Sequence, residues 1–254
     1  MKKDEIPFSG PFASFWTNIS SLNLQLMIST QFTDQECLDW ESSLRVDLQK
    51  VNSKINSDPI VERLKEAPLF MLNELRSSFI STTIINFTST TEHYLKDMIE
   101  LSLQRNSGFR KKAFVNHKMS AIELEENIDL NDIKKRIFKI ISAEHSKGPV
   151  LSSKFKKASS FLSIKEEIIT SEVFTSLDSI WRLRNKIAHS NKGFIKFFEI
   201  DSPVGLIKVS SEPEKEDYFY FCISLLKIID DFTALLNEWD RAVLEKWPAN
   251  SFIS

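Results

Sequence analysis

The sequence predicts an all-α fold, for three reasons. Glycine is scarce and phenylalanine is abundant, at 5 and 20 of the 254 residues, whereas turn-rich β architectures need many glycines. The stretch from Met71 to about Leu103 contains no Gly or Pro and carries apolar residues almost all round a helical wheel, which is typical of a central buried helix. A second long amphipathic stretch runs from Glu214 to Trp247. A chain of this length can bury a sizeable core without disulfides.

The N-terminal part is predicted to contain two helices. Residues 1–11 are expected to be a poorly ordered lead-in, and a first amphipathic helix is expected from Phe12 to about Ile28. A second helix is expected from Thr33 to about Asn56, because it opens with the Thr-x-x-Glu pattern of a capping box. We therefore divide the chain, a single domain overall, into residues 1–35, the lead-in and first helix, and residues 36–254, the main helical domain.

The pattern is less regular after the central helix. Asn106–Gly108 marks a turn, and residues 109–127 are predicted to form one or two short helices or irregular structure, with a local basic cluster at residues 110–112. A helix capped by Asp129 is then expected to run to about Glu144, where a Gly-Pro pair follows shortly.

A lysine-rich stretch runs from Ser152 to Ser163. Its basic residues alternate with aromatic ones, in the order Lys154, Phe155, Lys156, Lys157 and Phe161. Two interpretations stay open. The stretch could grip single-stranded nucleic acid by charge and stacking, or it could be a solvated loop held in place by its phenylalanines.

The most informative stretch is a predicted helix from Glu172 to Ser190. At about 100° per residue, its apolar side chains fall on one face, and these are Val173, Leu177, Ile180, Trp181, Ile187 and Ala188. Arg184 falls near the middle of that face, where a guanidinium must be paired, hydrogen-bonded or turned into a cleft. Arg182, Asn185 and His189 lie along one edge of the face, and an imidazole near a helix end can titrate near neutral pH.

A small hairpin is expected after this helix. Phe194–Ile200 and Gly205–Ser210 have short β character and flank a turn sequence. The last long helix follows.

Glu92 is the acidic residue of the central helix that we single out. It lies seven residues from both Ile85 and Ile99, on the same side of the helix as these apolar residues. Glu92 is therefore either solvated or faces Arg184 or His189 across a helix interface.

The segment from Arg184 to His189, with the sequence Arg-Asn-Lys-Ile-Ala-His, resembles the signature of HEPN domains, which is Arg, a polar residue, three further residues and His. The resemblance covers the chain from about Leu44 to Trp247 and is strongest to stand-alone bacterial proteins of the RiboL-PSP or MAE type. It implies a HEPN-like helical bundle, here with a small β-hairpin inserted after the helix that carries the motif.

The resemblance also implies a metal-independent endoribonuclease that needs no cofactor. The 2′-hydroxyl of RNA attacks the adjacent phosphate and yields a 2′,3′-cyclic phosphate and a 5′-hydroxyl. His189 would move a proton and Arg184 would stabilise the phosphorane. Asn185 would hold the imidazole or contact a phosphate oxygen, and Glu92 would set charge and orientation. Arg182 is a secondary candidate for the phosphate contact.

HEPN ribonucleases typically form their site at a two-fold interface, so the resemblance implies a homodimer with a composite active site that takes RNA. Candidate RNA contacts are the lysines that flank the motif and those of the lysine-rich stretch, namely Lys186, Lys192, Lys154, Lys156 and Lys157. A toxin or antiviral defence effector is the implied role, with an antitoxin or a sensor protein as a further partner. Adenylylation two residues after the motif His is disfavoured, because that position is Asn191 rather than Tyr.

Two other interpretations of the motif are kept. A non-catalytic HEPN-like helical module could bind RNA or a protein partner without cutting. Alternatively, the motif is coincidental in a structural protein, with Arg184 paired to a buried carboxylate and His189 interacting with the helix dipole.

Other classes of site find little support in the sequence. His93, His117 and His145 lack the spacing of metal ligands, and Cys37 and Cys222 are expected to be small buried hydrophobes. There is no Gly-rich phosphate loop and no nucleophile elbow. The formal charge of −2 requires any nucleic-acid surface to be local. No apolar run reaches the length of a signal peptide or a membrane span, so we expect a cytoplasmic protein without a membrane partner.

Overall fold

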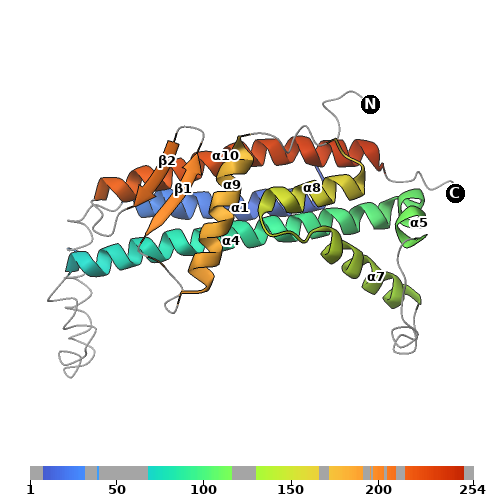
Figure 1. The fold of residues 1–254 in the computed structure, drawn as a ribbon, viewed down its shortest axis with the longest axis horizontal. Coiled ribbons are helices and arrows are strands. Elements are labelled where there is room, and N and C mark those ends of the chain that lie inside the picture. Colours follow the sequence, from blue (N-terminus) through green and yellow to red (C-terminus); the bar gives the residue numbers. More distant parts are fainter. Residues whose placement is uncertain are drawn as a thin grey trace, which may run out of the picture.

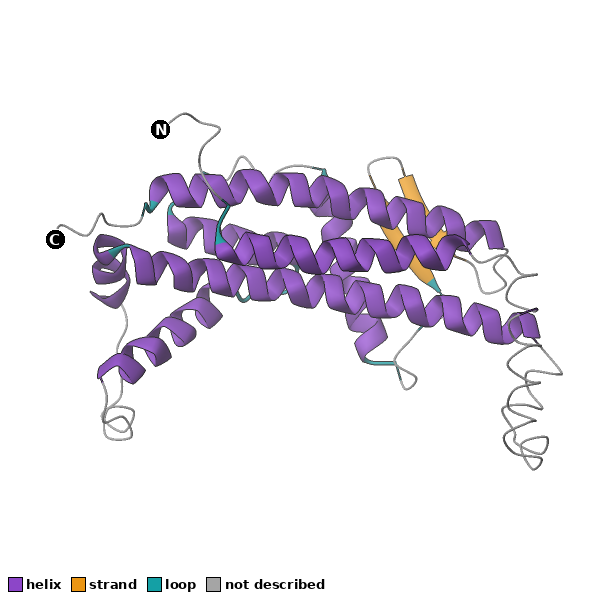
Figure 2. Ribbon diagram, turned by 180° about the vertical axis from the view of Figure 1, so that it is seen from behind, coloured by secondary structure: helices purple, strands orange, loops and turns teal. Residues whose placement is uncertain are grey.

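Three long helices lie side by side and form the body of the computed structural model (Figures 1 and 2). They are α1 (Gly10–Gln31), α4 (Pro68–Arg105) and α10 (Lys215–Lys246). The structure describes residues 8–31, 39, 68–115, 130–165, 172–190, 195, 197–202, 205–209 and 215–248. The expected second helix from Thr33 to Asn56 lies outside these residues, apart from Asp39.

Shorter elements complete the described fold. They are α5 (Ser107–Val115), α7 (Leu130–His145), α8 (Leu151–Leu162), α9 (Val173–Ala188), β1 (Phe198–Ser202) and β2 (Gly205–Val209). The strands form an antiparallel hairpin in which Ile200 pairs with Ile207. The described residues are thus mostly helical with one small two-stranded sheet, which confirms the expected all-α class and the hairpin after the motif helix.

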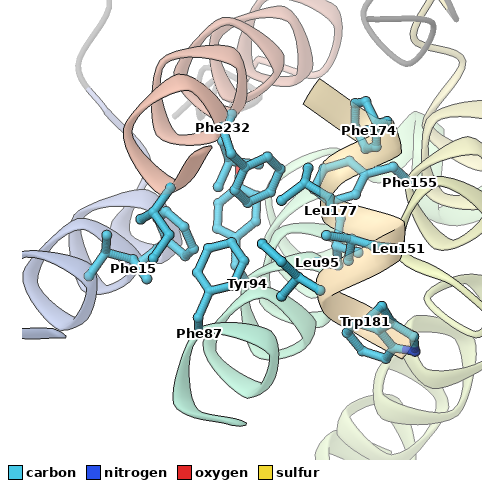
Figure 3. Close-up of a cluster of buried hydrophobic side chains, with 14 of the residues drawn as sticks. Phe15, Phe87, Tyr94, Leu95, Leu151, Phe155, Phe174, Leu177, Trp181 and Phe232 are labelled. Atoms are coloured by element: carbon cyan, nitrogen blue, oxygen red, sulfur yellow. The ribbon is translucent and has the colours of Figure 1, made fainter. Parts of the chain in front are cut away.

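The core is centred on Phe232 of α10, which contacts an aromatic ring from each of four other helices (Figure 3). The partners are Phe15 of α1, Phe87 of α4, Phe155 of α8 and Phe174 of α9, with centroid distances of 5.7–6.4 Å and near-perpendicular planes. Such edge-to-face packing is the favoured geometry for aromatic pairs. One side chain thereby joins the three long helices to α8 and α9.

Two buried hydroxyls of α4 are accommodated by the helix itself. Thr91 and Thr88 are 0% and 1% exposed, and their hydroxyls donate to the carbonyls of Phe87 and Ile84 at 2.9 Å. Because each hydroxyl finds a partner one turn earlier, these residues can lie inside the bundle without an unsatisfied donor. The low helix propensity of the Ser- and Thr-rich middle of α4 therefore does not interrupt the helix.

The start of the described chain is fixed rather than loose. Ser9 caps α1 by accepting from the Phe12 amide at 3.0 Å, and its own amide donates to the buried Asp240 carboxylate of α10 at 3.1 Å. Tyr94 of α4 donates to the same carboxylate at 3.0 Å. Burial raises the pKa of Asp240, and the hydrogen bonds from Ser9 and Tyr94 act in the opposite direction. The expectation of a poorly ordered lead-in as far as residue 11 is therefore wrong for residues 8–11.

The lysine-rich stretch is helix α8, so the interpretation as a solvated loop is wrong, whereas the nucleic-acid interpretation stays a prediction. Its buried positions recur at helical spacing, at Leu151, Lys154, Phe155, Ala158 and Leu162. The helix ends at Ser163, which adopts the left-handed conformation at φ 57°. Its amide donates to the Ser160 carbonyl, which satisfies part of the helix end.

Candidate functional site

Helix α9 carries the Arg184–His189 motif and lies across the long helices (Figure 1). It contacts β1, α4, α8 and α10. The predicted apolar face is confirmed at Leu177, Ile180, Trp181 and Ile187, which are at most 4% exposed. Ala188 is exposed, contrary to expectation, because it is the last helical residue. Contact on several sides fixes the direction in which the motif side chains leave the helix.

Arg184 is half-buried and held by residues of its own helix. Its Nη1 donates to Oδ1 of Asn185 at 3.1 Å, and its guanidinium carbon lies 5.8 Å from the centroid of the Trp181 ring. Its Nε is buried without a hydrogen-bond partner in the described structure. No carboxylate of the described residues forms an ion pair with Arg184, so the core arginine paired with a buried carboxylate is not observed there. An arginine N–H without a partner can donate a hydrogen bond to a ligand.

His189 lies at the C-terminal cap of α9. Its amide donates to the Asn185 carbonyl at 3.1 Å, its backbone stays close to helical at φ −92° and ψ −1°, and its side chain is exposed. Asn185 therefore contacts both motif partners, Arg184 through its side chain and His189 through its backbone. The imidazole is accessible to solvent and to a ligand.

The Trp181 ring contacts a second cation, Lys154, and this contact was not predicted from the sequence. The ammonium group of Lys154 in α8 lies 4.2 Å from the centroid of the Trp181 ring, and the same ammonium forms an ion pair with Glu92 of α4. Cation–π contacts are favourable when the cation is withdrawn from water, and the Lys154 side chain is 8% exposed. Glu92, Lys154, Trp181 and Arg184 thus form one connected cluster, which we call the Trp181 cluster.

Glu92 therefore has a different partner from the one that was expected. Its ion pair is with Lys154, whereas the prediction placed it opposite Arg184 or His189. The solvated alternative is also incomplete, because the Glu92 side chain is only 27% exposed. The described contacts connect Glu92 to Arg184 through Lys154 and the Trp181 ring.

The candidate RNA contacts separate into two groups. Lys154 is buried and paired, so its expected role as an exposed RNA contact is wrong for this structure. Lys156, Lys157 and Lys186 are exposed, which keeps an RNA contact open to each of them. Lys192 lies outside the described residues. The signal for a buried Lys154 was its position three residues after Leu151, on the apolar face of α8.

Arg182 pairs with a residue of the hairpin. Its guanidinium forms a 3.9 Å ion pair with Asp201 of β1, and both side chains are more than half exposed. An exposed pair of this kind contributes little to stability. Ser179 strengthens the same connection by accepting from the Asp201 amide at 3.1 Å. Arg182 thus links α9 to the hairpin, which favours Arg184 for any contact with a phosphate.

Asp178 positions α8 against α9. Its carboxylate accepts from the amide of Ser152 at 2.8 Å and from the Ser152 hydroxyl, in the first turn of α8. The adjacent N-cap residue, Val150, provides no side-chain cap of its own. The Asp178 carboxylate of α9 thus acts as the N-cap of α8, and its negative charge interacts favourably with the dipole of that helix.

Replacing Asp178 by alanine is expected to destabilise the fold by about 1–2 kcal/mol, because the first turn of α8 loses its acceptor. Urea unfolding followed by circular dichroism measures this loss. Asp231→Ala, at an exposed position of α10, is the matched control and should change stability by less than about 0.5 kcal/mol. Equal losses in the two variants would show that the capping contact contributes nothing.

The arrangement offers a fixed cation and an accessible imidazole on one helix. Five residues separate Arg184 from His189, which places them about 140° apart around an ideal helix. The helical backbone of His189 keeps this angle close to that value. The side chains of Arg184 and His189 therefore leave α9 in different directions.

Neither a metal cluster nor a reactive thiol is seen in the described part of the chain. No three His, Cys, Asp or Glu side chains gather there in a way that could hold a metal ion. Cys222 is a buried free thiol, as expected, and burial raises its pKa to about 12. Cys37 lies outside the described residues. None of the described helices combines the length and apolar character needed to cross a membrane.

Comparisons with protein-family models, with curated proteins and with solved structures find no match to this chain. What the chain does has therefore to be inferred from the chemistry of its own residues.

Proposed function

We propose that the chain is a metal-independent endoribonuclease of the HEPN type. The observation that carries the proposal is the Arg184 guanidinium, which contacts Trp181 and Asn185 and keeps a buried Nε without a described protein partner. The exposed His189 lies five positions later in the chain. A guanidinium that is already positioned can bind a phosphate oxygen as charge develops there. An accessible imidazole can move a proton.

The proposed reaction needs two proton transfers and no metal ion. One group removes the proton of the RNA 2′-hydroxyl, whose oxygen attacks the adjacent phosphorus. The bond to the 5′-oxygen then breaks, and that oxygen takes a proton from a second group. The products are a 2′,3′-cyclic phosphate and a 5′-hydroxyl. His189 is our candidate for one transfer, and His189 of the partner subunit is the candidate for the other.

We infer a homodimer from the same geometry. The angle of about 140° between Arg184 and His189 around an ideal helix disfavours contact of both groups with one phosphate from a single protomer. A two-fold axis near the end of α9 would bring a second Arg184 and a second His189 to the same groove, and a two-fold interface of this kind is the commonest in homo-oligomers. Lys186, Lys156 and Lys157 are exposed, and each is a candidate contact to the RNA backbone.

Within this proposal, Glu92 positions Arg184 rather than touching RNA. It holds Lys154 against the Trp181 ring, and that ring supports the Arg184 guanidinium. A cytoplasmic toxin or antiviral effector that cuts cellular RNA is the role that fits this activity.

Purified protein is expected to cut labelled single-stranded RNA in the presence of excess EDTA. The fragments should end in 2′,3′-cyclic phosphates, which treatment with polynucleotide kinase and acid can identify. A substrate with a 2′-deoxy residue on the 5′ side of the cleaved bond should resist cleavage, because it lacks the nucleophile. Cleavage that stops on addition of EDTA, or that leaves a 3′-hydroxyl, would contradict the proposed mechanism.

A binding module without catalysis is the second candidate. The wide angle between Arg184 and His189 favours it if the chain is monomeric in solution, because the two groups then contact separate phosphates. RNA binding without cleavage, together with a monomeric mass in light scattering, would identify this function instead.

A further inference from the structure

A pocket of about 330 Å³ is lined by residues of α5, α7 and α8. Figure 1 shows α5 and α7 near the end of the bundle where α4 ends. Its volume is at the lower end of the range of small-molecule sites. No residue of the Trp181 cluster and none of the motif residues lines it. The ribonuclease proposal therefore makes no use of this pocket.

The walls of the pocket are aromatic and firmly packed. Phe109 of α5 is 2% exposed and contacts the rings of Trp247 and Phe161 at centroid distances of 4.6 and 5.1 Å. Trp247 is itself fixed, because its indole nitrogen donates to the Leu162 carbonyl at 2.6 Å. The wall is therefore formed before any ligand arrives, which lowers the entropic cost of binding.

His145 of α7 continues the aromatic wall. Its ring stacks on Phe161 at 3.8 Å with an interplanar angle of 12°. Burial lowers the pKa of His145, and the positive charge of Lys157 lowers it further, whereas Glu144 raises it. The stacked rings of His145 and Phe161 suit a planar aromatic guest.

Two charged residues of opposite sign complete the lining. Lys112 of α5 and Glu144 of α7 both line the pocket and are exposed. Among the described residues, neither forms an ion pair with the other or with a third group. The neighbouring Arg110 is engaged differently, since its guanidinium donates to the carbonyls of Leu103 and Gln104 at 3.4 Å, where α4 ends. Lys112 is therefore the cation of the 110–112 cluster that the pocket can use.

We propose that this pocket binds a small heteroaromatic anion, namely a planar ring with an N–H donor and one carboxylate or phosphate group. The ring lies against Phe109 and the Phe161–His145 stack, Glu144 accepts from the ring N–H, and Lys112 pairs with the anionic group. Lys112 selects a ligand with an anionic group, and Glu144 selects one with a hydrogen-bond donor. The two residues together therefore define the class of ligand. Isothermal titration with the full-length chain can test this assignment.

Indole-3-acetate is the first probe, because it combines an indole N–H with a carboxylate. 1-Naphthaleneacetate has a similar shape without the N–H, and adenosine 5′-monophosphate offers a phosphate and an amino group. We expect indole-3-acetate or the nucleotide to bind. Tighter binding of indole-3-acetate identifies a carboxylate as the preferred anion, and tighter binding of the nucleotide identifies a phosphate. The naphthalene compound should bind at least about 5-fold more weakly than indole-3-acetate, a difference that Glu144→Gln should reduce.

Lys112→Glu is expected to weaken binding of the preferred probe at least about 10-fold. Lys111→Glu makes the same charge change at the neighbouring exposed position, which does not line the pocket, and should keep the affinity within about 2-fold. Circular dichroism confirms that both variants fold, since both lysines are exposed. The absence of heat with all three probes at millimolar concentration would overturn the proposal, and so would equal losses in the two lysine variants.

Discussion

Replacing His189 by alanine is expected to lower the rate of RNA cleavage by about 100-fold or more, which is the ordinary contribution of a positioned acid or base. Its side chain is exposed and belongs to no described packing cluster. Its removal should therefore leave the midpoint of urea unfolding unchanged. Single-turnover cleavage of a labelled RNA gives the rate, and the unfolding curve of the same preparation gives the stability.

Arg184→Lys tests the other half of the site. Lysine keeps the positive charge but loses the planar fork of donors, so we expect a loss in rate similar to that of His189→Ala. Arg182→Lys is the matched control, because Arg182 lies two residues earlier on the same helix and pairs only with the exposed Asp201 in the described structure. Its rate should stay within about 2-fold of the wild type.

The outcomes of these variants separate the functions. Loss of cleavage in the His189 and Arg184 variants with retained RNA binding supports the ribonuclease. A full rate in His189→Ala would exclude this imidazole from the reaction. An equal loss in Arg182→Lys and Arg184→Lys would show that the positive charge of the helix, rather than a positioned guanidinium, is what RNA needs.

Most of the fold could be predicted because the long helices have long, uninterrupted patterns. The central helix was expected from Met71 to Leu103 and is α4, Pro68–Arg105. The last was expected from Glu214 to Trp247 and is α10, Lys215–Lys246. In each case about thirty residues without a breaker leave few alternatives to a helix, and the ends differ by one to three residues.

The buried positions of the lysine-rich stretch recur at helical spacing, and its charged residues do not reveal this. Lys154 lies on the same face of α8 as Leu151 and Phe155, and that face is buried against the core. A lysine can enter such a face only when its charge has partners, and both come from distant parts of the sequence, 62 residues earlier at Glu92 and 27 residues later at Trp181. Propensity and periodicity carry no information about contacts of this range.

The resemblance to the HEPN signature rests on six residues, and the environment of these residues could not be predicted from the sequence. The helical wheel placed Arg184 within an apolar face and left three outcomes open, which were a buried carboxylate, a hydrogen bond or a cleft. In the structure, the Arg184 guanidinium lies near the Trp181 ring and donates to the Asn185 side chain. Both contacting residues lie within three positions of Arg184. The environment of its guanidinium nevertheless depends on how α4 and α8 pack on α9.

Glu92→Gln is expected to destabilise the fold by about 3 kcal/mol, because it leaves the Lys154 ammonium buried without its counterion. Lys154→Met should cost only about 1 kcal/mol, because methionine can fill the same space and Glu92, at 27% exposure, keeps some contact with water. The double variant should recover to within about 1 kcal/mol of the wild type. The three free energies of unfolding form a double-mutant cycle, and additive losses would mean that the two charges do not interact.

The double variant also tests whether the Trp181 cluster matters for function, since its fold should be nearly as stable as that of the wild type. The Trp181 ring then contacts an apolar side chain in place of a cation, while Arg184 keeps its contact with Asn185. If the Lys154 ammonium helps to fix the ring on which Arg184 rests, the cleavage rate should fall about 10-fold although stability is retained. An unchanged rate would limit the roles of Glu92 and Lys154 to holding α4 and α8 together.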